Sequence, residues 1–192
     1  MFLTNFYFYS LFKLILTDVA LEATDNDKHW YVVLTRTNSE RKVRDYFQLQ
    51  EVDTFLPVQS RVIEREGKRI ERERLLLPRM VFVRISRQEM FAVRNTLNVY
   101  DFLRDRSTGA PTCIPDRQMA DFRYMLDYSH DQVILTGETI PQGTRVVVAK
   151  GDLQGLRGEL VRYNNKYHIL VRIDMFGSAM VTIPASYVRK DK

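Results

Sequence analysis

From His29 onward, apolar and polar positions follow two different periods, first that of a strand and then that of a helix. Residues 30–35 are mostly aromatic or β-branched, which is typical of a buried strand. Residues 37–50 place apolar side chains on one face at helical spacing. Thr37 and Glu40 have the spacing of a capping box, in which a hydroxyl and a carboxylate each satisfy a free N–H at the helix start.

Two long extended stretches follow and predict a hairpin. Residues 55–65 and 68–77 are joined at Glu66-Gly67, where the glycine permits the positive φ of a tight turn. Residues 61–74 include six basic and four acidic residues, so this ribbon is too polar to lie flat on a core along its whole length. We expect the tip to project, either against a partner or as a solvated ribbon whose charges prevent edge pairing. The residues leave both alternatives open.

The next elements mix strands with helices. Residues 81–85 and 99–103 have strand character, residues 88–95 have helical spacing, and Pro115 precedes a third helix with an apolar stripe that reaches Leu126. This order predicts an α+β fold, in which three helices lie on an antiparallel-rich sheet as an α/β sandwich.

After Ser129 the pattern changes to strands alone. Residues 130–143 contain two glycines and a proline without a helical period, and we interpret them as a linker. From Thr144 the chain has short strands separated by turns, which predict a small C-terminal β-barrel, because closure removes exposed edges. The predicted domains are therefore residues 29–129 and 144–192.

Residues 1–28 stand apart from both domains. The stretch up to Val19 is largely apolar, but Asn5, Lys13 and Asp18 interrupt it, and it falls short of the roughly 20 apolar residues of a membrane span. A secretory signal requires basic residues before its apolar stretch, and none is present here. We interpret the segment as a disordered extension or as the product of a start codon placed too far upstream. An anchor at a membrane surface is the less favoured alternative.

Composition narrows the classes of function. The chain has 29 Lys and Arg against 24 Asp and Glu, a net charge of +5 that permits contact with nucleic acid without requiring it. Its one cysteine, Cys113, cannot form an intrachain disulfide, which fits a reducing compartment, and with only three histidines no structural zinc site is expected. Neither a phosphate-binding loop nor a Ser-His-acid spacing is present. An enzyme is thus the weakest interpretation, and no cofactor is expected.

The order of these motifs resembles the NusG family of transcription factors over nearly all of the chain after His29. Residues 30–33 (Trp-Tyr-Val-Val) resemble the first strand of the family's N-terminal, or NGN, domain. Residues 77–83 (Leu-Pro-Arg-Met-Val-Phe-Val) resemble a strand preceded in the family by aromatic-Pro-Gly-Tyr. Residues 146–158 and 173–177 resemble the KOW module. The polar hairpin and diverged motifs are most similar to specialised paralogues, such as the UpxY-type antiterminators of polysaccharide operons.

The resemblance implies an elongation or antitermination factor whose N-terminal domain grips the clamp helices of the largest RNA polymerase subunit in an apolar cavity. The matching positions are Leu77, Pro78, Met80 and Phe82, with Tyr31 and Phe122 nearby. The alternative is that these are core residues of the sheet; we favour it for Phe82, and contact for Leu77 and Met80. Arg79 replaces the family's usual glycine and Met80 its tyrosine, which implies a cavity of different shape.

The resemblance also implies contact with the single-stranded non-template DNA of the transcription bubble, while the hairpin at residues 61–74 reaches across the polymerase cleft. The positions that match basic or pause-related motifs of family members are Arg36, Lys42, Arg94, Asn95 and Thr96. Basic side chains follow phosphates, and Asn and Thr hydrogen-bond base edges. An ordinary exposed helix face is the alternative for at least half of them.

The family's KOW barrel recruits a second partner, either a termination factor or a small-subunit ribosomal protein. Met175, Phe176 and Ser178 match its contact loop, with Ser178 where the common pattern has a basic residue. The density of β-branched residues favours a barrel over the helical hairpin of some paralogues. The resemblance further implies a cytoplasmic monomer without membrane contact. The alternatives are a general NusG-type elongation factor and, from another class, a ribosome-associated KOW protein that binds RNA.

Overall fold

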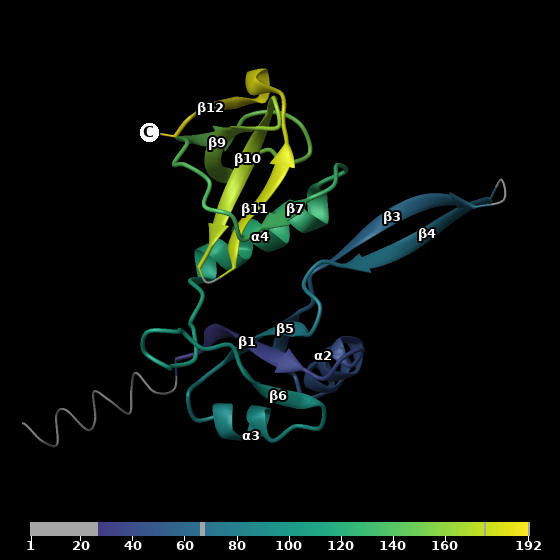
Figure 1. Cartoon of the computed structure of the whole chain (residues 1–192), viewed down its shortest axis with the longest axis vertical. Helices are drawn as coiled ribbons and strands as arrows, with labels where there is room; N and C mark the ends of the chain where they lie inside the picture. The colour runs from purple at the N-terminus through teal and green to yellow at the C-terminus, as the bar shows by residue number, and fades with distance from the viewer. Residues whose placement is uncertain (1–26, 66–67, 175, 192) are drawn as a thin grey trace, which may run out of the picture.

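The computed structural model describes residues 27–65, 68–174 and 176–191. An N-terminal domain and a C-terminal barrel lie one above the other, and a long hairpin extends sideways from the region between them (Figure 1). The predicted extension, residues 1–28, lies outside the described residues except for its last two.

The N-terminal domain is built on a four-stranded antiparallel sheet. Its elements are β1 (His29–Thr35), α2 (Glu40–Leu49), β2 (Asp53–Phe55), β5 (Met80–Ile85), α3 (Met90–Arg94), β6 (Val99–Phe102) and α4 (Asp116–Tyr128). The strand order is β2-β5-β1-β6. Trp30 and Val32 of β1 share a core with α4, while Tyr31 and Val33 face the core formed with α2 and α3. The predicted α+β class with three helices is confirmed.

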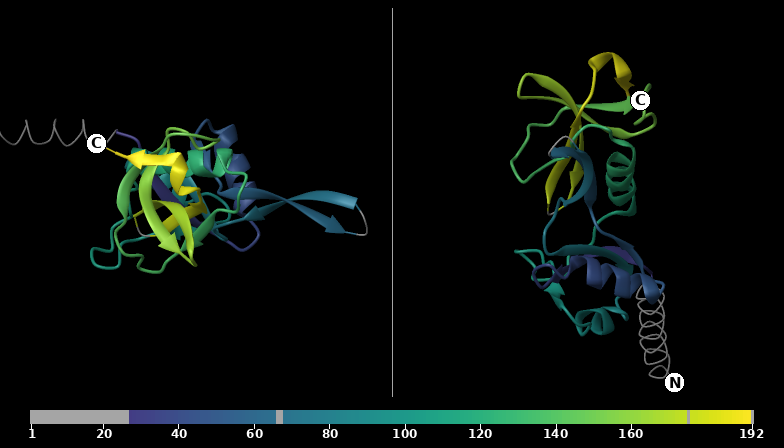
Figure 2. Two further views of the ribbon diagram at one scale, coloured as in Figure 1. Left: turned by 90° about the horizontal axis from the view of Figure 1, so that it is seen from above. Right: turned by 90° about the vertical axis from the view of Figure 1, so that its right-hand side faces the viewer.

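The hairpin consists of β3 (Val58–Arg65) and β4 (Lys68–Leu75), which form a two-stranded sheet of their own. Their register runs from Val58 opposite Leu75 to Arg65 opposite Lys68. The turn predicted at Glu66-Gly67 lies outside the described residues, but this register leaves two residues for it. Seen from above, the ribbon points away from both domains, as predicted (Figure 2).

The start of α2 differs from the predicted capping box. The helix begins at Glu40 with Ser39 as N-cap, and no side-chain hydrogen bond caps it. The Glu40 carboxylate instead accepts the backbone N–H of Arg79 at 2.7 Å. The capping-box prediction was wrong because the helix starts later than the box requires: Ser39 is the N-cap, so Glu40 is the first helical residue and not the third.

The barrel is a six-stranded antiparallel sheet in the order β12-β8-β9-β10-β11-β7. Its elements are β7 (Ile134–Thr136), β8 (Thr144–Val148), β9 (Arg157–Tyr163), β10 (Lys166–Ile173), β11 (Gly177–Thr182), the 3-10 helix η1 (Ala185–Tyr187) and β12 (Val188–Lys190). The strand β7 lies inside the segment predicted as a linker and pairs with β11. Val133 and Ile140 on either side of β7 are buried, so this segment is packed onto the barrel.

Helix α4 connects the two domains physically. It lies against the barrel strands in both Figure 1 and Figure 2, and its buried residues share one core with the barrel and with β1 and β5. Two hydrogen bonds reinforce the contact: Asp174 N–H donates to Gln118 Oε1 at 2.9 Å, and the Tyr124 hydroxyl donates to Gln154 O at 2.9 Å. The domains therefore meet through a continuous apolar core with polar bonds at its edge.

Candidate functional site

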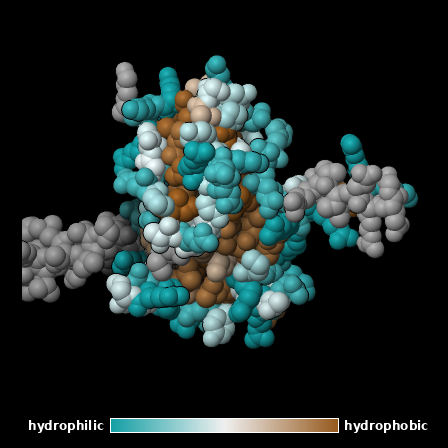
Figure 3. All heavy atoms as spheres, turned by 45° about the horizontal axis from the view of Figure 1, so that its top comes forward, coloured by the Kyte–Doolittle hydropathy of each residue, from teal (hydrophilic) through white to brown (hydrophobic). Residues whose placement is uncertain are grey.

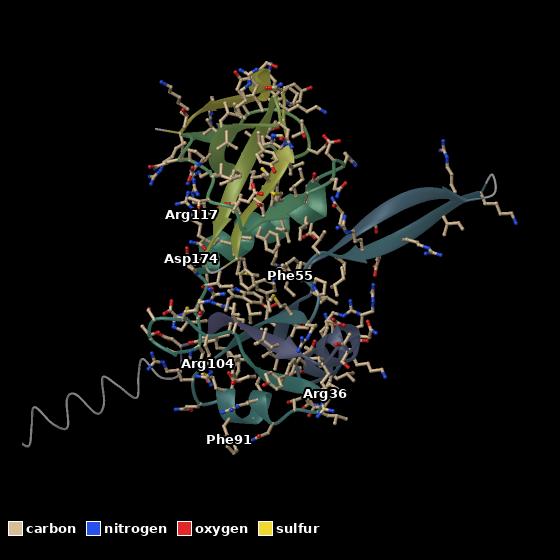
Figure 4. The ribbon with its side chains drawn as sticks, in the orientation of Figure 1. Arg36, Phe55, Phe91, Arg104, Arg117 and Asp174 are labelled. Atoms are coloured by element: carbon tan, nitrogen blue, oxygen red, sulfur yellow. The ribbon has the colours of Figure 1, made fainter. Side chains whose placement is uncertain are left out.

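A cluster of four phenylalanine rings lies between the N-terminal sheet and the barrel. The Phe82 ring centroid lies 5.9 Å from that of Phe55, 6.1 Å from that of Phe122 and 5.5 Å from that of Phe176. Phe55 and Phe122 meet edge to face at 5.7 Å, and Figure 4 labels Phe55 at this junction. Aromatic pairs at such separations stabilise beyond their buried area. Strands β2 and β5, helix α4 and the β10–β11 turn thus meet at one point.

Leu77 and Met80 are half-buried and pack against the larger apolar core that contains these rings, while Pro78 between them is exposed. Phe82 and Phe122 are fully buried. The structure therefore brings four of the six predicted polymerase-binding residues into one apolar site, which we call the ring cluster. Figure 3 shows apolar residues gathered between the base of the hairpin and the body, bordered by hydrophilic ones.

Tyr31 is not part of the ring cluster. Its side chain is 5% exposed and packs edge to face on Phe102 at 6.2 Å, in the core beneath α2 and α3. Neighbouring residues of a strand point to opposite faces, so Tyr31 and Val32 belong to different cores. The alternation along β1 contained this information.

Arg123 of α4 covers the open side of the ring cluster. Its guanidinium carbon lies 5.5 Å from the Trp30 ring centroid and 5.4 Å from that of Phe55, both within cation–π range. It also donates to the Asp53 carboxylate at 3.4 Å. Trp30, Phe55 and Arg123 were not predicted as site residues. Phe55 of β2 lies directly opposite Phe82 of the adjacent strand β5, a pairing that only the sheet order reveals.

Arg36 and the end of α3, two of the regions predicted to bind nucleic acid, lie at the end of the N-terminal domain away from the barrel (Figures 1 and 4). Arg36 N–H donates to Asn98 O at 2.9 Å, which holds its loop beside the segment that follows α3. Arg94 and Asn95 are exposed after α3, and Lys42 is exposed on α2. Thr96 is half-buried, and its hydroxyl donates to Ala92 O at 3.2 Å. Figure 4 shows Arg36 at this end of the molecule.

Three large apolar side chains are exposed beside these polar residues and were not predicted. Phe91 is 79% exposed, Leu97 83% and Tyr100 71%. Asp101 on β6 binds two arginines, Arg104 at 3.2 Å and Arg94 at 3.4 Å. Burial opposes ionisation of Asp101, but these arginines and the Phe102 N–H outweigh it, so its pKa lies below the ordinary value.

No group of three or more His, Cys, Asp or Glu side chains could hold a metal ion within the described ranges 27–65, 68–174 and 176–191. Nor is any helix of those ranges long and apolar enough to cross a membrane.

Comparison with known proteins identifies the family. A model of the NusG family, described as transcription termination factor NusG, matches residues 28–123, half of the chain. The chain belongs to the NusG family. Members of this family are non-enzymatic transcription factors. No curated protein matches the chain.

Solved structures of NusG and Spt5 proteins are similar to the chain. A structure of Thermotoga maritima NusG, described by its domain interaction, has 20% identity and a TM-score of 0.47, and the match covers 86% of this chain and 98% of that one. Conformations A and B of the MjSpt4:Spt5 complex have 13% and 14% identity and TM-scores of 0.28 and 0.30. Those matches cover 85% and 84% of this chain and 98% and 95% of theirs.

Arg79, which stands at the glycine position of the family motif, has a left-handed backbone conformation. Arg79 has a φ of 65°, a conformation that costs a residue with a Cβ roughly 1–2 kcal/mol. Its Nε donates to Thr35 O at 3.3 Å, and its carbonyl accepts Thr35 N–H at 2.8 Å. The side chain and the backbone of Arg79 are thus both hydrogen-bonded to Thr35, which offsets part of the cost of the left-handed conformation.

The predicted partner loop of the KOW barrel is turned toward the NusG N-terminal domain. Phe176 packs on Phe82, and Ser178 is buried on β11. Gly177 between them has a φ of 95°, and a Cβ there would lie 2.2 Å from Thr136 O. Met175 lies outside the described residues. Of the two described loop residues, Phe176 is thus occupied by a contact within the chain.

Proposed function

We propose that this chain is a bacterial transcription elongation or antitermination factor that binds the clamp helices of the largest RNA polymerase subunit and suppresses pausing or termination. The observation that carries the proposal is the apolar edge of Leu77 and Met80 beside Phe82 in a chain of the NusG family. A helix docked on such an edge removes apolar area from water. The protein acts as a cytoplasmic monomer without a cofactor.

The ring cluster sets a condition on this binding. Phe82 and Phe122 are fully buried, and Phe176 of the barrel packs on Phe82. A clamp helix reaches these rings only when Phe176 withdraws, whereas Leu77 and Met80 are accessible at the start. Binding must therefore outweigh the free energy of separating the barrel from the N-terminal domain.

The exposed end of the N-terminal domain would contact the non-template strand. Arg36 and Arg94 would follow its phosphates, and Asn95 and Thr96 would read base edges. Lys42 on α2 adds a further cation, and the projecting hairpin would reach across the polymerase cleft. This assignment is supported by the exposure of Arg36, Lys42, Arg94 and Asn95, and by the place of Arg36 away from the barrel (Figure 4).

Within the family we place the chain among operon-specific antiterminators of the UpxY type, because Arg79, Met80 and Ser178 depart from the common pattern. A general NusG-type elongation factor is the alternative. A ribosome-associated KOW protein that binds RNA is the alternative of another class. The barrel would recruit a ribosomal protein or a termination factor after it separates from the ring cluster.

A pull-down of core RNA polymerase tests the proposal. The wild-type chain should retain polymerase, and the double variant Leu77→Asp, Met80→Asp should not, because two carboxylates would be buried against the docked helix. The matched control is Leu49→Asp, at an exposed leucine on α2 outside the ring cluster, which should bind as the wild type does. Circular dichroism confirms that each variant folds.

Two outcomes would refute polymerase binding through this edge. One is failure of the wild-type chain to retain polymerase; the other is equal loss in Leu49→Asp and in the double variant. Co-sedimentation with ribosomal subunits in the absence of polymerase binding would favour the ribosome-associated alternative.

A further inference from the structure

A polar groove, separate from the ring cluster, lies where the first half of α4 meets the barrel. It has a volume of about 500 Å³. Arg117 and Asp121 line it from α4, and Arg145, Arg157 and Glu159 line it from the barrel. Arg145 of β8 lies directly opposite Glu159 of β9, so their side chains share one face of the sheet. Figure 4 labels Arg117 at this corner.

The ion pair of Arg172 and Glu159 in the groove uses most of its hydrogen-bonding groups within the protein. The Arg172 guanidinium donates two hydrogen bonds of 2.8 Å to the Glu159 carboxylate. It donates a third, at 3.2 Å, to Ile140 O. This bidentate pair neutralises Glu159 and leaves little capacity in Arg172 for a ligand.

The remaining cations of the groove are loosely held. Arg117 lies 3.9 Å from Asp121, and Arg157 lies 4.0 Å from Asp191, separations too long for hydrogen bonds. Over residues 27–65, 68–174 and 176–191, the Arg145 side chain makes neither an ion pair nor a hydrogen bond. Three guanidinium groups thus line one groove with N–H donors that are available to a ligand.

The surroundings of the groove are basic. Residues 144–192 contain nine Lys and Arg and four Asp and Glu, so the barrel alone carries a net +5, equal to that of the whole chain. Arg189 of β12 and Arg157 of β9 each pair with Val147 of β8, which places them on one face, two strand spacings or about 10 Å apart. The row of arginines therefore continues out of the groove along the sheet.

We infer that this groove binds the phosphodiester backbone of single-stranded nucleic acid through Arg117, Arg145 and Arg157. Planar guanidinium groups bind phosphate oxygens in pairs. Because α4 and the barrel both supply arginines, a bound strand also holds α4 against the barrel. None of these arginines belongs to the ring cluster, so oligonucleotide binding and the polymerase pull-down test different surfaces. A strand that holds α4 against the barrel would oppose the separation that the proposed clamp binding requires.

Asp121 allows a second test, in which a substitution is expected to raise the affinity for the strand. Burial raises the pKa of this carboxyl, and the charges of Arg117 and Arg157 oppose the rise. A phosphate that draws these arginines away leaves the Asp121 carboxylate less compensated and repels it. Removing its charge should therefore strengthen binding, while removing an arginine should weaken it.

Fluorescence anisotropy of a labelled 12-nucleotide single-stranded RNA with the full chain tests the inference, with the same DNA sequence and its duplex as further arms. Arg145→Gln and Arg157→Gln should each weaken binding about 3–10-fold, and Asp121→Asn should strengthen it about 2–5-fold. Each arginine variant should also reduce the slope of log affinity against log salt by about 0.7. The matched control is Arg162→Gln, at an exposed arginine of β9 outside the groove, which should change affinity less than twofold.

Three results would overturn the inference: no saturable binding by the wild type, equal losses in Arg162→Gln and Arg145→Gln, or loss in Arg36→Gln without loss in Arg145→Gln. The last would assign the strand to the far end of the N-terminal domain. Pyrophosphate serves as a competitor. Competition against bound RNA supports phosphate recognition, whereas pyrophosphate binding without any oligonucleotide binding overturns the assignment to nucleic acid.

Discussion

The Glu40 carboxylate accepts a 2.7 Å hydrogen bond from the backbone N–H of Arg79, joining the first turn of α2 to the residue before β5. Glu40 is buried, and Arg79 is the left-handed residue of its loop. This bond fixes the loop that presents Leu77 and Met80, the proposed polymerase-binding edge.

Removing the Glu40 carboxylate should destabilise the N-terminal domain. Glu40→Ala deprives the Arg79 N–H of its acceptor, and we expect the free energy of unfolding to fall by about 1–3 kcal/mol. Glu40→Gln keeps an acceptor oxygen and should cost less than about 1 kcal/mol. Urea denaturation followed by circular dichroism measures both. Equal losses in the two variants would show that the hydrogen bond is not the stabilising element.

Position 79 should prefer glycine to other replacements. Arg79→Gly removes the left-handed penalty of roughly 1–2 kcal/mol but also the bond from Nε to Thr35 O, so we expect a change in unfolding free energy within about 1 kcal/mol. Arg79→Val keeps the penalty, loses the bond and should destabilise by more than about 1 kcal/mol. Thermal unfolding of the two variants under the same conditions measures this difference in stability. A valine variant as stable as the glycine variant would contradict this account.

Replacing Phe176 should loosen the barrel from the N-terminal domain. Phe176→Ser removes one ring from the ring cluster and exposes Phe82, so amide NMR resonances of β5 should shift while those of β6 stay in place. If polymerase binds Phe82 as proposed, affinity should rise several-fold, because less free energy is needed for separation. Unchanged β5 resonances would show that Phe176 does not hold the domains together.

The exposed aromatic residues beside α3 should contribute to binding of single-stranded DNA at the far end of the N-terminal domain. Base stacking on an aromatic ring contributes about 1–3 kcal/mol, so Phe91→Ala and Tyr100→Ala should each weaken binding about fivefold or more. Tyr100→Phe should bind normally. Leu49→Ala, equally exposed on α2 at 80%, is the control and should have no effect. The Arg145→Gln background removes any contribution of the barrel groove.

Acid should weaken the barrel through Glu159. The hydrogen bonds from Arg172 hold the pKa of Glu159 below its ordinary value; burial opposes this, and the Gly143 N–H assists it. A carboxyl with a lowered folded pKa stabilises above its ordinary pKa of 4.5, and that stabilisation is lost as pH falls through the folded value. The free energy of unfolding should therefore decline as the pH falls below about 4.5 and through the lower folded pKa. Glu159→Gln should flatten this decline; an unchanged pH profile would rule out the pair as its source.

Sequence periodicity by itself determined most of the elements and their order, but it missed the separate strand β2 and the strand β7 within the predicted linker. The strand at residues 30–35, the charged hairpin, the helix after Pro115 and the change to strands after Thr144 all follow from local patterns of burial and turn residues. These predictions succeeded because periodicity reports which side chains of one element share a face. The capping box failed because the helix begins only after Ser39, and the Glu40 carboxylate accepts the distant Arg79 N–H.

Only the tertiary structure decided which faces meet. It placed Tyr31 and Phe82 in different cores, seated Phe176 on Phe82, paired β7 with β11 and brought Arg117 of α4 beside Arg145 and Arg157 of the barrel. A sequence pattern shows that a face is apolar or charged, but several elements could cover it. The choice rests on packing and charge contacts between segments far apart in the chain, and these form only when the whole chain has folded.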